Sequence, residues 1–180
     1  MKTKIFGDKK ITIRKLSKED LRNAKKFQDF INSFVKEDAQ IIMDEKISLK
    51  GEKKWLKEKL GRIKKKKAVF LIAEYNNMIV GTAGIDLYIW RKSHVAELGI
   101  TIKKDYRGMG LGTCLIKEII KLAKKELKPK PKIIRLDALS TNKPAISLYK
   151  KTGFKIVAKI PKQIQYKGKL INEIIMLLYL

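Results

Sequence analysis

The residues from Asp105 to Thr113 have the composition of a phosphate-binding turn. They read Asp-Tyr-Arg-Gly-Met-Gly-Leu-Gly-Thr, with glycine at Gly108, Gly110 and Gly112. Glycine adopts backbone conformations that other residues resist and lets a ligand approach the main chain closely. A strand pattern precedes the turn and a helical pattern follows it, and the free N–H groups at a helix start suit a phosphate or pyrophosphate. The segment therefore predicts an anion-binding turn.

Two common nucleotide-binding motifs do not fit this spacing. A P-loop needs Gly-Lys-Ser/Thr after its last glycine, but Gly112 is followed by Thr113 and Cys114. A Rossmann fingerprint has the spacing G-x-G-x-x-G near the first strand of its domain, whereas this chain has G-x-G-x-G in its middle. Both interpretations are therefore excluded.

A second patterned block runs from Ser140 to Phe154, after a buried-strand pattern at Ile133–Leu139. It reads Ser-Thr-Asn-Lys-Pro-Ala-Ile-Ser-Leu-Tyr-Lys-Lys-Thr-Gly-Phe and resembles the N-x-x-A-x-x-L-Y-x-x-x-G-F element of the GNAT superfamily of acyl-CoA-dependent N-acetyltransferases. Arg107, Gly110 and Gly112 resemble the Arg-x-x-Gly-x-Gly signature of the same family. The resemblance is strong over residues 68–180 and compatible with the family over the first 65.

This resemblance implies that acetyl-CoA is the co-substrate and that no metal ion takes part. It implies that the strands at Val95–Ile102 and Ile133–Leu139 splay apart, that pantetheine inserts between them, and that an N–H there polarises the thioester carbonyl. Asn142 would contact the cofactor, although its alternative role as a helix N-cap can hold at the same time. The cofactor-binding residues implied are Ile100, Thr101, Ile102, Arg107, Gly108, Met109, Gly110, Leu111, Gly112, Thr113, Asn142 and Tyr149.

Tyr149 resembles the family tyrosine that lies near the thioester sulfur and protonates the departing thiolate. A phenol with a pKa near 10 is a weaker acid than a thiol with a pKa near 8.5, so the site must assist this transfer or use the tyrosine partly for orientation. The alternative interpretation is an aromatic side chain that packs on the sheet.

An amine acceptor needs a proton acceptor, because an alkylammonium ion has no lone pair for attack. Glu97 lies where many relatives place an acidic base, and Asp137 resembles the position used by ribosomal-protein N-acetyltransferases. Both interrupt apolar runs, where an unpaired carboxylate is costly. Pairing with a lysine is the alternative for Glu97, pairing with Arg135 is the alternative for Asp137, and Asp86 is a third candidate base.

The chain has one cysteine, Cys114, and one histidine, His94, which excludes a disulfide framework and a multi-histidine metal centre. Cys114 enters a helix without an evident catalytic partner and is expected to be a packed thiol. The net charge is +25, but only six of the 43 basic residues are arginine. Lysine supplies solvated point charge rather than base readout, so we expect loose association with nucleic acid at most.

The hydrophobic periodicity predicts the elements that position these residues. Strands are expected at Lys10–Leu16, Ala68–Tyr75, Met78–Ile89, Val95–Ile102, Ile133–Leu139, Phe154–Ile160 and Ile171–Tyr179. Helices are expected at Ser17–Val35, Glu52–Lys66, Leu111–Leu127 and Asn142–Thr152. The fold class is therefore α/β, as one domain over residues 1–180 with a single mixed, mostly antiparallel, twisted sheet of about seven strands and about four helices. Within this domain, the acceptor side would be formed by residues 1–66 and the acetyl-CoA-binding core by residues 67–180. The opening through which the acceptor enters would be formed by residues 36–51 and 161–170, which we call the acceptor mouth.

The sequence thus predicts a cytoplasmic N-acetyltransferase, monomeric or homodimeric, without a signal peptide or membrane span. It would transfer acetyl from acetyl-CoA to a primary amine by direct attack in a ternary complex. The positive charge suits a protein N-terminus on an acidic surface or a ribosome better than a cationic polyamine. A small-amine (polyamine or xenobiotic-amine) acetyltransferase and a non-catalytic basic module that binds nucleic acid or ribosomes are the alternatives.

Overall fold

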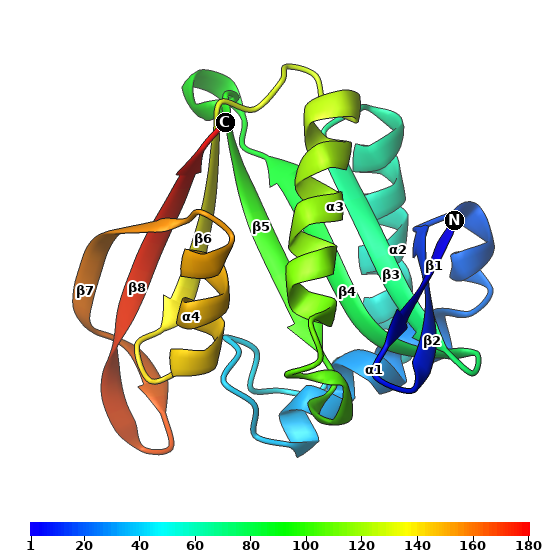
Figure 1. Cartoon of the computed structure of the whole chain (residues 1–180), viewed down its shortest axis with the longest axis horizontal. Helices are drawn as coiled ribbons and strands as arrows, with labels where there is room; N and C mark the ends of the chain where they lie inside the picture. The colour runs from blue at the N-terminus through cyan, green and yellow to red at the C-terminus, as the bar shows by residue number, and fades with distance from the viewer.

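The computed structural model describes residues 1–180 and contains one eight-stranded sheet with four α-helices (Figure 1). The strands are β1 (Lys2–Phe6), β2 (Lys9–Lys15), β3 (Ala68–Tyr75), β4 (Met78–Leu87), β5 (Val95–Ile102), β6 (Ile133–Leu139), β7 (Lys155–Tyr166) and β8 (Lys169–Tyr179). The helices are α1 (Ala24–Lys36), α2 (Leu49–Lys64), α3 (Leu111–Glu126) and α4 (Lys143–Lys151). The strand order is β1-β2-β3-β4-β5-β6-β8-β7, and β5 with β6 is the one parallel pair. The expected mixed, mostly antiparallel sheet is confirmed.

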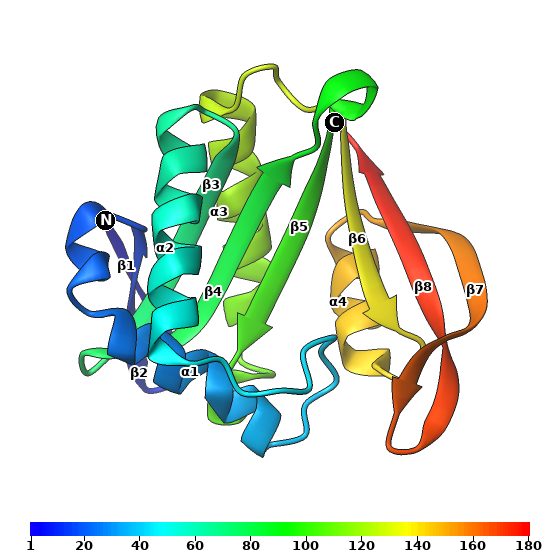
Figure 2. The ribbon, with the colours of Figure 1, turned by 180° about the vertical axis from the view of Figure 1, so that it is seen from behind.

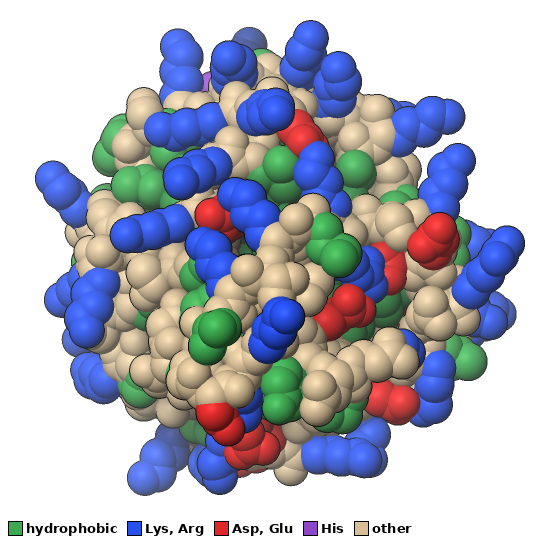
Figure 3. Space-filling view, turned by 45° about the vertical axis from the view of Figure 1, so that its right-hand side comes forward, with side chains coloured by type: hydrophobic (Ala, Val, Ile, Leu, Met, Phe, Trp, Pro, Cys, Tyr) green, Lys and Arg blue, Asp and Glu red, His purple; other side chains and the backbone are tan.

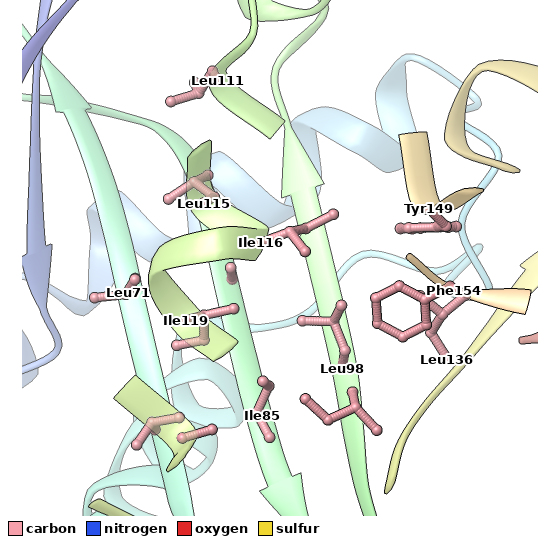
Figure 4. Close-up of a cluster of buried hydrophobic side chains, with 14 of the residues drawn as sticks. Leu71, Ile85, Leu98, Leu111, Leu115, Ile116, Ile119, Leu136, Tyr149 and Phe154 are labelled. Carbon is pink, nitrogen blue, oxygen red and sulfur yellow. The ribbon is translucent and has the colours of Figure 1, made fainter. Parts of the chain in front are cut away.

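The helices form two layers on the sheet. Helices α3 and α4 lie on the face toward the viewer in Figure 1, and α1 and α2 lie on the face toward the viewer in Figure 2. Helix α3 is held by an apolar stripe whose residues are completely buried against the central strands (Figure 4). The stripe consists of Leu111, Leu115, Ile116, Ile119 and Ala123. The start of α3 is therefore fixed relative to β4 and β5.

Strands β5 and β6 separate soon after they meet. They pair only where Val95–Glu97 lies beside Ile133–Arg135, whereas β6 pairs with β8 along its whole length. The separation widens toward the start of α3 (Figure 1). From Leu98 to Ile102, the edge of β5 that faces β6 thus has no strand partner. The splay expected at this position is confirmed.

The sheet has one more strand than the sequence pattern predicts. Strand β1 pairs with β2 in an antiparallel hairpin, but four of its five residues are exposed. An exposed edge strand needs no alternation of apolar and polar residues, so the pattern did not reveal it. The cap expected at Ser17 is present, as a capping box with Asp20, but it opens a short 3₁₀ helix at Lys18–Leu21, and α1 itself begins only at Ala24.

Other boundaries differ in ways that affect the site. Helix α2 begins at Leu49, three residues before the predicted start, because the Ser48 hydroxyl caps it by accepting a hydrogen bond from the Gly51 N–H at 3.1 Å. Glu52 is therefore inside the first turn of the helix. Strand β7 continues to Tyr166, past the predicted end at Ile160.

Lysine and arginine side chains stand out all over the face drawn in Figure 3, with acidic side chains between them. The charge on this face is thus distributed and does not form one basic groove. No helix of the structure is both long enough and apolar enough to cross a bilayer.

Candidate active site

The glycine turn leads from the end of β5 into α3. Gly108 and Gly110 have φ angles of 78° and 90°, which favour glycine. The first main-chain bond of the helix runs from the Cys114 N–H to the Gly110 carbonyl, at 3.1 Å. The N–H groups at 111–113 therefore have no acceptor inside the helix. They are the donors that a pyrophosphate needs, at the place where β5 and β6 are separated.

Gly112 lies where α3 touches its neighbours. A Cβ atom on Gly112 would lie 2.8 Å from Leu148 Cδ2 on α4 and 3.2 Å from Ile102 Cδ1 on β5. Only glycine therefore lets α4 approach the first turn of α3 this closely.

Replacing Gly112 by alanine should displace α4 from the start of α3. We expect a destabilisation of about 1–3 kcal/mol, the usual cost of overpacking, and at least tenfold weaker binding of acetyl-CoA. Urea denaturation and isothermal titration calorimetry measure the two effects. Gly61→Ala is the matched control: Gly61 lies within α2 with open space around it, so alanine should stabilise the fold by about 1 kcal/mol. Unchanged stability and affinity in Gly112→Ala would show that Leu148 simply rotates away.

The side chain of Arg107 has a structural partner that the sequence did not indicate. Its Nε donates to the Ile102 carbonyl at 2.8 Å, and its two Nη atoms donate to the Glu37 carboxylate at 2.5 and 3.2 Å. Arg107 thus links the end of α1 to the glycine turn. The Arg107 side chain is therefore engaged within the protein, and the expected binding of the cofactor by the main chain of the turn stays a prediction.

Residues 37–48, which we call the crossing loop, extend from α1 toward α4 below the separated strands (Figure 2). Asn142 donates to the Gln40 carbonyl at 3.2 Å, and the Thr141 hydroxyl donates to Gln40 Oε1 at 2.8 Å. Asn142 Oδ1 also accepts from the Ala145 N–H at 3.2 Å, which confirms the N-cap role. The crossing loop is therefore tied to the start of α4.

The crossing loop is also tied to the β7–β8 hairpin. The Tyr166 hydroxyl donates to the Asp38 carbonyl at 2.9 Å, and Lys167 Nζ lies 2.9 Å from Asp38 Oδ2. The two segments expected to form the acceptor mouth thus contact each other.

Tyr149 lies on the β5 side of α4, with its ring above Phe154 (Figure 4). The two rings are 6.2 Å apart in an edge-to-face arrangement, so the side chain does pack in the core. Its hydroxyl has no hydrogen-bond partner within the protein. Burial raises the pKa of Tyr149 to about 12. The phenol is therefore neutral, and a donor, at any physiological pH.

A cavity of about 320 Å³ lies between β4–β5 and the α1–α2 layer. Its floor is nearly bare main chain, because Gly84 and Gly99 are direct partners across the two strands. A Cβ on Gly84 would lie 2.7 Å from the ring of Phe70. Beside the glycines, the hydroxyls of Thr82 and Thr101 are 2.8 Å apart. The walls are apolar and consist of Phe27, Phe30, Ile31, Met43, Ile47, Trp55 and Phe70.

The three carboxylates proposed from the sequence have different surroundings. Asp86 lines the cavity but is bound by Lys59 and by Arg62 Nε, the latter at 2.8 Å. Asp137 accepts a hydrogen bond from Arg135 Nε at 3.0 Å, so the ion pair that was the alternative to a catalytic role is present.

Glu97 is exposed on β5, on the cavity face of the sheet, and has no lysine partner. Burial, and next the negative charge of Glu97, raise the pKa of Tyr88. Neither Glu97 nor Asp137 lines the cavity. Their role as the general base stays a prediction.

Glu52 is the titratable cavity residue that the sequence interpretation missed. Its side chain lines the cavity, the residue is 4% exposed, and it forms no ion pair. Burial raises the pKa of Glu52 to about 7. A signal was present: Glu52 lies four residues before Leu56 and eleven before Ile63, on the apolar side of the helix.

Comparison with known proteins shows which family has this fold and these sequence blocks. Residues 28–154 match the model of the acetyltransferase (GNAT) family. The chain is similar to an uncharacterised N-acetyltransferase of Methanocaldococcus jannaschii, with 34% identity over 157 residues, covering 81% of this chain and 61% of that protein. It is also similar to an L-amino acid N-acetyltransferase of Escherichia coli, with 34% identity over 87 residues, 48% of this chain and 52% of that protein. The chain thus spans about half to three fifths of the length of these curated relatives.

The fold is similar to that of a putative acetyltransferase of Salmonella typhimurium, whose structure contains its cofactor acetyl-CoA. The TM-score is 0.78 at 21% identity, over 94% of this chain and 93% of that one. Because the family model covers well over half of the sequence, including both patterned blocks, the chain belongs to the GNAT acetyltransferase family.

Proposed function

We propose that this chain transfers an acetyl group from acetyl-CoA to a primary amine by direct attack in a ternary complex. The observation that carries the proposal is the position of the cavity: its floor is the main chain of β5 at Gly99, just beyond the point where β5 leaves β6. A cofactor between the strands and an acceptor in the cavity would therefore meet at the same strand.

The residues around this point fit acetyl-CoA, which supplies an activated acetyl thioester. Main-chain N–H groups at 108–113 would bind the pyrophosphate, whereas the Arg107 N–H already donates to the Lys104 carbonyl at 3.2 Å. Asn142, at the start of α4, would contact the cofactor from there. N–H groups at Ile100–Ile102 polarise the thioester carbonyl. The neutral hydroxyl of Tyr149 donates to the departing sulfur. Glu97 or Asp137 would take the ammonium proton through water.

The acceptor that the cavity fits best is a small molecule with a primary amine. A volume of about 320 Å³ is at the lower end of the usual size for ligand sites. The crossing loop contacts both α4 and the β7–β8 hairpin, which leaves little room for a folded protein to reach the floor. The name of the Escherichia coli relative, an L-amino acid N-acetyltransferase, also supports a small acceptor.

A protein N-terminus is the second candidate. The net charge of +25 attracts an acidic protein surface at long range and repels a cationic polyamine. A flexible N-terminal residue could enter the cavity if the crossing loop moves away from the hairpin.

A screen with acetyl-CoA and a panel of amines tests the proposal and separates the two candidates. The panel contains L-amino acids, amino acid amides, alkylamines, polyamines and peptides with free or blocked N-termini, and free thiol is measured. Turnover of small amines alone supports the first candidate, and turnover of free N-terminal peptides alone supports the second. No thiol release with any amine, together with no acetyl-CoA binding in calorimetry, contradicts the proposed function.

A further inference from the structure

The cavity contains one carboxylate without a cationic partner. Two carboxylates line it, Asp86 from β4 and Glu52 from α2. Asp86 is bound by both Lys59 and Arg62, so its charge is already compensated. Glu52 forms no ion pair and no side-chain hydrogen bond, although the residue is 96% buried. Every completely buried side-chain oxygen or nitrogen atom of the protein has a hydrogen-bond partner. The carboxylate oxygens of Glu52 have none, so they keep some accessible surface.

No cationic side chain compensates the charge of Glu52, and the first turn of α2, in which it lies, offers only the partial positive charge of a helix start. The only other charged groups facing the cavity are Lys59 and Asp86, which bind each other. Helix α1, the crossing loop and β3 contribute only apolar side chains, and β5 contributes Thr101 with main chain. An unpaired carboxylate in such surroundings lowers the stability of the fold. A glutamate is therefore not expected at this position if the residue has only a structural role. A cation that enters the cavity would remove this cost.

We propose that Glu52 binds the ammonium group of the acceptor in the cavity and takes its proton before the amine attacks the thioester. This role rests on the proposed function and assigns to Glu52 the base that the sequence placed at Glu97 or Asp137. The cavity floor joins the two reactants, because Gly99 and Thr101 belong both to the cavity lining and to the free part of β5.

The proton transfers balance as follows. The carboxylate of Glu52 takes one proton from the ammonium ion, which leaves a neutral amine with a lone pair. The nitrogen–carbon bond forms and the carbon–sulfur bond breaks. The second nitrogen proton goes to the sulfur by way of the Tyr149 hydroxyl, and Glu52 returns its proton to solvent. The products are an amide, a free thiol and one proton.

The surroundings of Glu52 also suit it to the task. Burial raises its pKa to about 7, which brings it closer to that of an amine. Relative to a carboxylate of pKa 4.5, Glu52 therefore takes a proton from a given amine about 300 times more favourably. An α-amino group with a pKa near 8 needs only about a tenfold uphill transfer, compared with about a thousandfold for an alkylamine near 10. The site thus favours α-amines that carry an apolar group.

The test compares wild type with Glu52→Gln on 3-methylbutylamine and L-leucinamide, with release of free thiol as the readout. With 3-methylbutylamine, kcat/KM of wild type should fall below about pH 7, where Glu52 is protonated. In the variant only free amine reacts, so the fall should begin near pH 10. We expect kcat/KM of the variant to be at least a hundredfold lower than that of wild type at pH 7. The ratio of the two values should decrease as the pH approaches 10.

Glu58→Gln is the matched control, because Glu58 is an exposed glutamate on the same helix. It should keep the wild-type pH profile. Glu52→Ala is a second variant, and formate, which fits the space of the lost carboxylate, should partly restore its activity.

An unchanged pH profile in Glu52→Gln, with wild type active, overturns the role of Glu52 and leaves the proposed function standing. A shift of the pH profile of kcat/KM toward pH 10 in Glu97→Gln, but not in Glu52→Gln, would show that Glu97 is the general base. Wild type without turnover on any amine of the panel contradicts the proposed function itself and this role with it.

Discussion

The Tyr149→Phe variant is expected to lose about a hundredfold in kcat while binding acetyl-CoA as tightly as wild type. The expected loss is at the lower end for the removal of a general acid, since the carbon–sulfur bond then breaks without a proton donor. The ring remains, so its edge-to-face contact with Phe154 is kept. The lost hydroxyl has no protein partner, so the free energy of unfolding should not fall.

Steady-state kinetics at saturating amine, with calorimetric titration of acetyl-CoA, measures this effect. Because burial raises the pKa of Tyr149 to about 12, wild-type kcat should show no loss from ionisation of Tyr149 below about pH 11. Tyr75→Phe, on a half-buried tyrosine at the end of β3, is the control and should keep wild-type kcat. A kcat unchanged in Tyr149→Phe, or a loss explained by weaker cofactor binding, would restrict Tyr149 to packing.

Glu52→Gln is expected to be more stable than wild type by about 3 kcal/mol at pH 8 and equally stable at pH 4. The pKa of Glu52 is about 7 in the folded chain, against 4.5 for an unperturbed glutamate. Below pH 4.5 Glu52 is protonated in both the folded and the unfolded chain, so its ionisation has no effect on the free energy of unfolding. As the pH rises from 4.5 to 7 the unfolded chain loses the proton first, which lowers wild-type stability by about 1.4 kcal/mol per unit of pKa shift. Glutamine has no charge to bury and escapes this loss.

Urea denaturation of wild type, Glu52→Gln and Glu58→Gln at the two pH values measures the difference. Glu58 is exposed, so its variant should follow wild type at both. A variant that gains stability at pH 8 and loses activity at pH 7 is the signature of a residue kept for function at a cost to the fold. Equal or lower stability of Glu52→Gln at pH 8 would instead show that the carboxylate has a stabilising partner.

The parts of the fold that local patterns encode were predictable from the sequence. The bounds of β5 and β6 agree with the predicted strands at Val95–Ile102 and Ile133–Leu139, because both are apolar runs that end at turn residues. The glycine turn and the start of α3 at Leu111 were also predicted, because Gly110 ends the turn with a positive φ. These features depend on neighbouring residues only. With the second patterned block, they were sufficient to indicate the family.

The contacts around the proposed acceptor cavity were decided by the tertiary structure. The link between Arg107 and Glu37 joins residues 70 positions apart, and the contact of Asp38 with Tyr166 joins residues 128 positions apart, so no local pattern reports them. In the sequence, Glu52 is one glutamate in a lysine-rich helix. Only the packed structure buries it in the cavity that Gly99 also lines. Sequence pattern determined the glycine turn and the helix start at which we propose that acetyl-CoA binds, because glycine conformation and helix starts are local. Only packing determined which carboxylate lies buried and unpaired in the cavity, because desolvation is a property of the assembled layers.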